Sequence, residues 1–158
     1  MKKIVALLLV VICFFSCTGK TAIGYNDTII KPQLEVVALL DSMFTKEVSY
    51  SNIQKYRESL IRVSDRALTQ IKKLEDYKGN TSFRMAGIKY FTFVSNYYLT
   101  TPNVDSLIYN SNSPERIETI PEDVFKKLQA DFNHFLVLEK ELLDEQQKFA
   151  NEFQINLK

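Results

Sequence analysis

The 158-residue sequence has little of the amino acids that build tight turns and many catalytic sites: four glycines, four prolines, two cysteines, one histidine and no tryptophan. So few glycines and prolines argue against a β-sandwich or barrel, because such folds need a turn about every 8–12 residues. The formal net charge is +1, from 20 basic and 19 acidic side chains. This balance supplies no basic excess that would drive binding to nucleic acid.

The single histidine, His134, restricts the classes of enzyme to which the chain can belong. Asp131 lies three residues before it, so a helix would place the two on one side. A di-iron bundle needs a Glu-x-x-His motif on two helices, and a serine or cysteine triad needs a histidine beside its nucleophile. We therefore expect a solvated His134, no enzyme activity, and no metal or other cofactor. A hydrolase with paired carboxylates is the least favoured alternative.

The N-terminus has the pattern of a secretory signal. Lys2 and Lys3 precede a run of twelve apolar residues, 4–15. A helix that spans a bilayer needs about twenty such residues. The run therefore fits the apolar region of a signal peptide better than a transmembrane helix.

The sequence FFSC, residues 14–17, follows this run and resembles the lipobox of bacterial lipoproteins, with phenylalanines where smaller aliphatic residues are usual. The resemblance implies that residues 1–16 are a lipoprotein signal peptide, that Cys17 is acylated, and that residues 17–24 are a lipidated tether. Cys13 would leave with the signal peptide, and one remaining cysteine cannot form an intramolecular disulfide. The alternative is an ordinary secreted protein, cut nearby, with a free cysteine.

Beyond the tether, the apolar residues recur three and four apart, which indicates helices. This spacing predicts four helices, at residues 25–46, 52–77, 82–99 and 120–153. The apolar stripe of the first helix is Ile30, Gln33, Val37, Leu40 and Phe44. The stripe of the fourth is Phe125, Leu128, Phe132, Phe135, Glu139, Leu142, Gln146, Phe149 and Phe153.

Local signals predict where these helices begin and end. Pro32 removes one intrahelical hydrogen bond, so the first helix should kink there or begin only near Ile30. Ser51 with Gln54, and Thr119 with Glu122, have the spacing of capping boxes. Gly79 lies where a glycine would end the second helix.

Four amphipathic helices predict an all-α fold, an antiparallel up-and-down four-helix bundle in one domain, residues 25–158. Two connections are short, whereas residues 100–120 form a long loop between the third and fourth helices. Loops of this length are uncommon in compact domains. We expect a short helix within it, from about Val104 to Tyr109.

Polar residues interrupt two of the apolar stripes. Burying Gln33, Glu139 or Gln146 without a partner would cost about 1–3 kcal/mol each. If Tyr25 is level with Phe153 in an antiparallel pair of helices, Gln33 lies opposite Gln146. We therefore predict that the two glutamines approach closely or share a buried polar network, with Tyr25 or Tyr97 as candidate further members. Glu139 either joins this network or is left exposed by rotation of its helix.

The third helix is rich in aromatic residues, and two readings of it stay open. Tyr90, Phe93 and Tyr97 could line a ligand cavity, or they could be ordinary core residues with the tyrosine hydroxyls at the rim. Ala86 and Gly87 of the same helix would allow a neighbouring helix to approach closely.

Two short motifs also resemble a known pattern. YNDTIIKPQ, residues 25–33, is similar to the opening of a family of uncharacterised bacterial surface lipoproteins that are predicted to be helical bundles. EQQKFA, residues 145–150, is similar to the end of that pattern. The resemblance implies a helical fold and a lipid anchor, and it implies no activity.

These features predict a lipoprotein anchored to the membrane through Cys17, with a helical domain that binds or scaffolds an unknown envelope protein. The alternative is a carrier or sensor that holds a small ligand in an aromatic cavity of the bundle. Thr18 follows Cys17. In similar Gram-negative lipoproteins an aspartate there often signals retention at the inner membrane. Its absence favours the outer membrane, on the periplasmic or the surface face.

Overall fold

The computed structural model describes residues 21–157, and within them the chain forms α-helices and no β-strand. The helices are α2 (Ala22–Met43), α3 (Tyr50–Ile71), α4 (Ser82–Thr100), α5 (Val104–Ser111), α6 (Pro114–Ile117) and α7 (Glu122–Phe153). The all-α prediction is confirmed. The sequence predicted four long helices and one short helix in the connection before the last of them; the described residues contain these five and also α6, which lies in the same connection.

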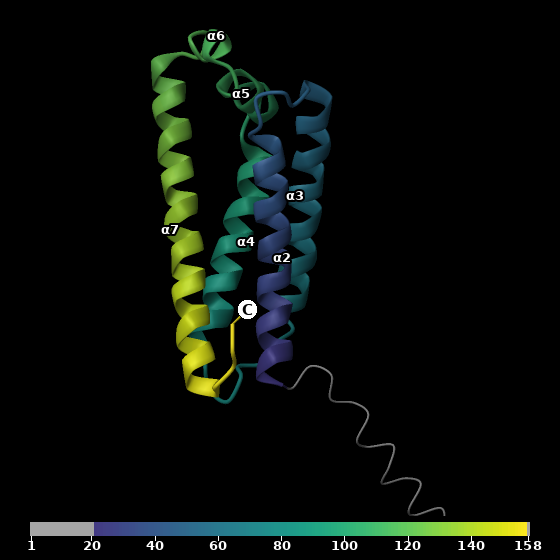
Figure 1. Ribbon diagram of the computed structural model, residues 1–158, viewed down its shortest axis with the longest axis vertical. Helices are drawn as coiled ribbons and strands as arrows, with labels where there is room; N and C mark the ends of the chain where they lie inside the picture. The colour runs from purple at the N-terminus through teal and green to yellow at the C-terminus, as the bar shows by residue number, and fades with distance from the viewer. Residues whose placement is uncertain (1–20, 158) are drawn as a thin grey trace, which may run out of the picture.

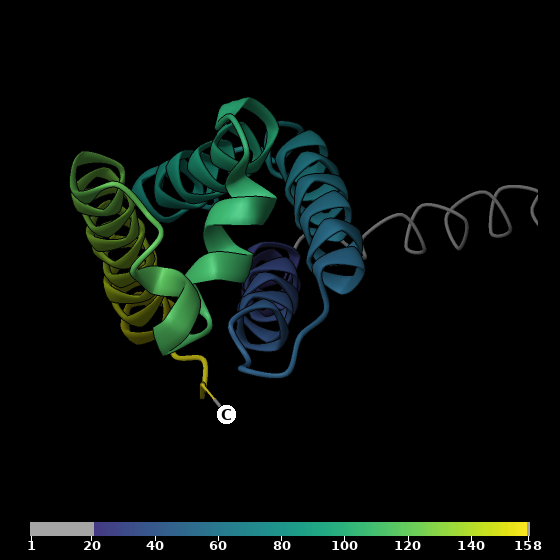
Figure 2. The same cartoon turned by 90° about the horizontal axis from the view of Figure 1, so that it is seen from above.

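Four long helices, α2, α3, α4 and α7, run along the long axis of the molecule, and each runs opposite to the one before it (Figure 1). The short helices α5 and α6 lie across one end of the four (Figure 2). The start of α2 and the end of α7 both lie at the other end (Figure 1). None of the helices in residues 21–157 has the length and apolarity needed to cross a bilayer.

The core lies between α2, α3 and α4, and one half of α7 adds to it. Its fully buried side chains include Ile29, Val36, Leu60, Ala67, Tyr90 and Phe91. Gly87 lies where α4 passes α2: a Cβ atom at this position would be 3.0 Å from Cγ2 of Ile29. The missing side chain therefore allows the close approach of helices that the sequence predicted at this glycine.

The start of α2 differs from the prediction. The helix begins at Ala22, where the hydroxyl of Thr21 accepts a hydrogen bond from the Gly24 amide at 3.0 Å, and it continues through Pro32 to Met43. A start near Ile30 is therefore wrong, and α2 includes the last three residues of the predicted tether. This capping hydroxyl satisfies one of the free amides in the first turn, which favours a start upstream of the proline.

The bounds of α3 also differ. Ser49, and not Ser51, caps its start by accepting a hydrogen bond from the Asn52 amide at 3.3 Å. The helix ends at Ile71 instead of residue 77, and Gly79 (φ +87°) lies in the turn that follows. Tyr77 packs against the core from this turn.

At the other end of the molecule, α7 begins at Glu122 with no side chain capping it. The Thr119 hydroxyl donates to the carbonyl of Arg116 instead, so the predicted capping box is wrong. The predicted helices at residues 82–99 and around 104–109 are confirmed by α4 and α5. Helix α6 carried no signal that the sequence analysis recognised.

Helix α5 contacts the long helices through both apolar and polar side chains. Val104 and Ile108 are buried. The Asp105 carboxylate lies 3.0 Å from Nε of Arg57 on α3. The Asn112 amide donates to the Met43 carbonyl, at the end of α2, at 2.9 Å. These contacts hold the connection over one end of α2 and α3.

Candidate functional site

Helix α7 packs differently along its two halves. All of its buried residues lie in the second half: Leu138, Leu142, Phe149 and Ala150. No residue between Glu122 and Val137 is buried, and Phe132 and Val137 expose 51% and 61% of their surface. The first half of α7 therefore carries an apolar stripe that no other helix covers fully.

The second half of α7 is held by an aromatic cluster. The ring of Phe149 stacks on Tyr25 with centroids 5.2 Å apart, and it lies 5.2 Å from Phe83 and 4.7 Å from Phe153. Tyr77, from the turn after α3, completes the cluster at 5.5 Å from Phe149. These contacts tie α7 to α2 and α4 near the end where α2 begins.

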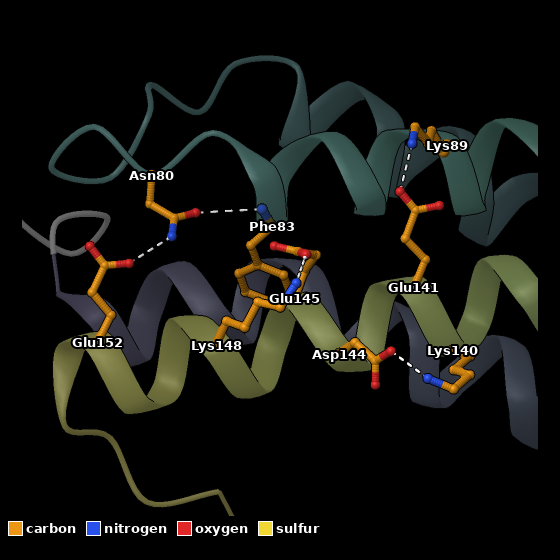
Figure 3. Close-up of polar contacts among 9 residues, drawn as sticks. All are labelled: Asn80, Phe83, Lys89, Lys140, Glu141, Asp144, Glu145, Lys148 and Glu152. Atoms are coloured by element: carbon orange, nitrogen blue, oxygen red, sulfur yellow. Dashed lines mark hydrogen bonds and ion pairs between the residues drawn. The ribbon is translucent and has the colours of Figure 1, made fainter.

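Polar contacts between α4 and α7 reinforce the same half (Figure 3). The Lys89 ammonium lies 2.6 Å from the Glu141 carboxylate. The Asn80 amide donates to Glu152 at 2.8 Å, while its oxygen accepts from the Phe83 amide at 3.4 Å. Asn80 thus links the start of α4 to the end of α7.

Where the first half of α7 stands beside α2 and α4, the structure contains a half-enclosed pocket of about 530 Å³. Helix α5 contributes Ile108 to its wall. Most of the lining is apolar. The lining residues are Val37, Leu40, Asp41 and Phe44 near the end of α2; Phe93, Val94, Tyr97 and Tyr98 of α4; Ile108; and Leu128, Gln129, Asp131, Phe132, Phe135, Leu136 and Glu139 of α7.

The aromatic residues predicted to line a cavity divide between pocket and core. Phe93 and Tyr97 line the pocket, and their rings stack at 5.8 Å. Tyr90 is fully buried and is not part of the lining, so its assignment to the cavity is not supported. Burial, followed by the charge of Asp131, raises the pKa of Tyr97 to about 12. Burial likewise raises the pKa of Tyr98, so both pocket tyrosines are neutral at physiological pH.

Sequence reasoning missed the contributions of α2 and α7 to the pocket. Val37, Leu40 and Phe44 belong to the predicted stripe of the first helix, and Phe132 and Phe135 to that of the last. Their spacing identified an apolar face correctly. Spacing cannot tell whether such a face meets another helix or an empty space.

The polar residues in the stripes are paired, but in a different register from the one predicted. Nε2 of Gln33 donates to Oε1 of Glu139 at 3.0 Å, and Nε2 of Gln146 donates to Oδ1 of Asn26 at 2.9 Å. The predicted pair of Gln33 and Gln146 is therefore wrong. The observed partner of Gln33, Glu139, lies seven residues before the predicted partner, Gln146, on α7. This is a displacement of about 10 Å along a helix.

The aromatic cluster is displaced in the same direction. Tyr25 stacks on Phe149, four residues before the Phe153 with which it was expected to be level. Tyr25 is buried in this cluster, and within residues 21–157 no hydrogen bond joins it to either glutamine. The stacked rings and the polar pairs thus both place α7 at an offset from the predicted register.

His134 is exposed, as expected, and its ring meets Phe93 edge-on at 5.0 Å. Asp131 lies on the wall of the pocket, and its carboxylate is 2.8 Å from the Lys127 ammonium. In the part of the chain that the structure describes, no group of three or more His, Cys, Asp or Glu side chains is placed to hold a metal ion. The pocket offers apolar, aromatic and carboxylate side chains to a ligand.

The predicted signal peptide and Cys17 lie outside the described residues. No protein-family model matches the chain, and no match to it was found among curated proteins or solved structures. The chemistry of the pocket is thus the feature from which a function is inferred.

Proposed function

We propose that this chain is a lipid-anchored protein of the bacterial cell envelope whose helical domain binds an apolar small molecule. The observation that carries the proposal is the pocket of about 530 Å³ with its largely apolar, aromatic lining. Ligand sites are mostly apolar clefts of about 300–1,000 Å³ with a few polar groups. This feature favours a carrier or sensor over a scaffold for a protein partner, and binding over catalysis.

We further propose that the four long helices form an antiparallel up-and-down bundle that is open along one seam. The alternating directions of α2, α3, α4 and α7 support this assignment (Figure 1). So do the bridges of Gln33 to Glu139 and of Asn26 to Gln146, which step seven residues forward on α2 and seven back on α7. The open seam lies between the first half of α7 and the end of α2.

The anchor and the pocket would lie at opposite ends of this bundle. Cys17 precedes the start of α2, whereas the pocket is lined by Val37 to Phe44, which lie about 20–30 Å further along the helix. Lipidation of Cys17 would therefore hold the protein at the outer membrane with its ligand site directed away from the bilayer. Such a position suits exchange of a ligand with the periplasm or the exterior.

The binding of a neutral apolar probe, N-phenyl-1-naphthylamine, tests this function. The protein would be the mature chain with Cys17→Ser, which contains every described helix and needs no detergent. We expect saturable probe binding, with an increase in fluorescence. Val37→Trp should fill the pocket and weaken binding about tenfold or more, because a bulky ring would occupy the space of the probe.

Leu34→Trp is the matched control. Leu34 lies three residues earlier on α2, exposes 59% of its surface and does not line the pocket. The natural chain has no tryptophan, so each variant carries a single tryptophan whose emission reports its burial. Absence of probe binding to the parent chain, or equal loss in both variants, would contradict the proposed function.

A further inference from the structure

The charged side chains that line the pocket are all acidic. Asp41, Asp131 and Glu139 contribute carboxylates, and the lining contains no lysine, arginine or histidine. The three carboxylates differ in whether a neighbouring cation neutralises their charge. Asp131 has the Lys127 ammonium beside it at 2.8 Å, whereas no ion pair joins Glu139 or Asp41 to another of the described residues. Asp41 is exposed to solvent and Glu139 is half-buried, so Glu139 is the unpaired carboxylate that is better shielded from water.

Glu139 is held in a defined position. The Gln33 side chain, only 3% exposed, donates to its Oε1 at 3.0 Å from α2. This bond orients the carboxylate without neutralising it, because an amide carries no charge. Gln33 therefore acts as a positioning residue for a carboxylate on the wall of the pocket.

Two buried polar atoms near Glu139 lack a hydrogen-bond partner. One is Oε1 of Gln33, which belongs to the same amide that bonds Glu139, and the other is the hydroxyl of Tyr90. Burial, followed by the charge of Glu139, raises the pKa of Tyr90. The lining includes neither Gln33 nor Tyr90, so the Glu139 carboxylate is the acceptor that this part of the pocket offers to a ligand that donates.

Aromatic rings form much of the remaining wall. Phe93 and Tyr97 face the pocket from α4, and Phe132 and Phe135 from α7. The faces of such rings attract organic cations, and the attraction grows when the cation leaves water. Apolar and aromatic walls beside one oriented carboxylate complement a molecule with an apolar body and an ammonium group.

We infer that the pocket selects amphiphilic organic cations, with an ammonium group at Glu139 and an apolar chain or ring system against the aromatic walls. The inference rests on the proposed function, since it names the class of ligand for the same pocket. A fatty acid or other organic anion would bring a like charge next to Glu139 and is expected to bind poorly.

Three ligands that share one chain and differ in the head group test this inference: decylammonium, decanol and decanoate. Each would displace N-phenyl-1-naphthylamine from the Cys17→Ser chain at pH 7, below its micelle concentration. We expect decylammonium to bind about tenfold or more tightly than decanol, the gain of one charge-assisted hydrogen bond. Decanoate should bind more weakly than decanol.

Glu139→Gln removes the charge and keeps an acceptor for the Gln33 amide. It should lower the affinity for decylammonium about tenfold and leave decanol nearly unchanged, so that decanol also reports an intact pocket. Glu145→Gln is the control: it removes one carboxylate from the same helix, outside this pocket. Probe binding with no preference among the three head groups, or a preference that survives Glu139→Gln, would overturn the inference and leave the proposed function standing. Failure of the probe itself to bind would overturn both.

Discussion

Single side chains set how far α7 lies along α2. The bridges of Gln33 to Glu139 and of Asn26 to Gln146 share one antiparallel register, and a slip by one helical turn would break both. Gln33 is nearly fully buried, so its amide cannot exchange its partner for water at little cost. The register of the two helices and the orientation of the pocket carboxylate therefore depend on the same glutamine.

A double-mutant cycle tests this coupling. Gln33→Leu alone should lower the free energy of unfolding by about 1 kcal/mol, because Glu139 loses its donor while remaining partly buried. The double variant Gln33→Leu, Glu139→Leu should lose less than the sum of the single changes, with a coupling energy of about 0.5–1.5 kcal/mol in urea unfolding.

Gln33→Leu combined with Gln146→Leu provides the comparison. The two glutamines bond to different partners, so their effects should add to within about 0.5 kcal/mol. A larger coupling between the two glutamines than between Gln33 and Glu139 would reject the observed register.

At the scale of elements, α7 divides into a half that packs and a half that lines a pocket. The packed half is held by the aromatic cluster around Phe149 and by the contacts of Asn80 and Lys89 (Figure 3). The other half has no buried residue, and Leu128, Phe132, Phe135 and Leu136 of it line the pocket. Stability and binding should consequently depend on different parts of one helix.

Two phenylalanines of α7 test this division. Phe149→Ala should lower the free energy of unfolding by about 3–5 kcal/mol, because Phe149 is fully buried among other rings. Phe132→Ala should cost about 1 kcal/mol or less, since half of its surface is already exposed to solvent. Urea unfolding measures both losses.

The same two substitutions should affect probe binding in the opposite order. Phe132→Ala removes part of the pocket wall and should weaken the neutral probe, whereas Phe149 lies outside the lining. Similar losses of stability in the two variants would contradict the division of α7 into two functional halves.

For the whole molecule, the described helices and the predicted anchor are separable. Residues 21–157 contain the six described helices, and Cys17 precedes them in the sequence. We expect Cys17→Ser to leave the protein unprocessed or to release it from the membrane fraction, with unchanged helical circular dichroism. Mass spectrometry of the natural mature N-terminus should show an acylated cysteine, whose several chains would give stable anchoring.

Cys13→Ser is the matched control for this experiment. Cys13 would be removed with the signal peptide, so its replacement should change neither the membrane fraction nor the mature mass. An unmodified mature N-terminus at another residue would reject the lipid anchor and leave the pocket unaffected.

The sequence predicted the features that depend on neighbours along the chain. Helical spacing identified the all-α class, the bounds of α4, the short helix α5 and the apolar faces of α2 and α7. It also identified Gln33, Glu139 and Gln146 as residues that need partners, and the structure provides one for each. These features follow from local periodicity and from the cost of burying a lone polar group, and both can be read from one chain.

The register of α7 and the pocket could not be read in this way. Gln33 meets Glu139 rather than Gln146, and Tyr25 stacks on Phe149; both contacts join residues more than one hundred positions apart. The pocket exists because α2, with Val37, and α7, with Phe132, border a space that neither helix fills. Such features depend on how large side chains from distant segments fit together. Periodicity fixes the direction in which a side chain points, and it carries no information about what lies opposite.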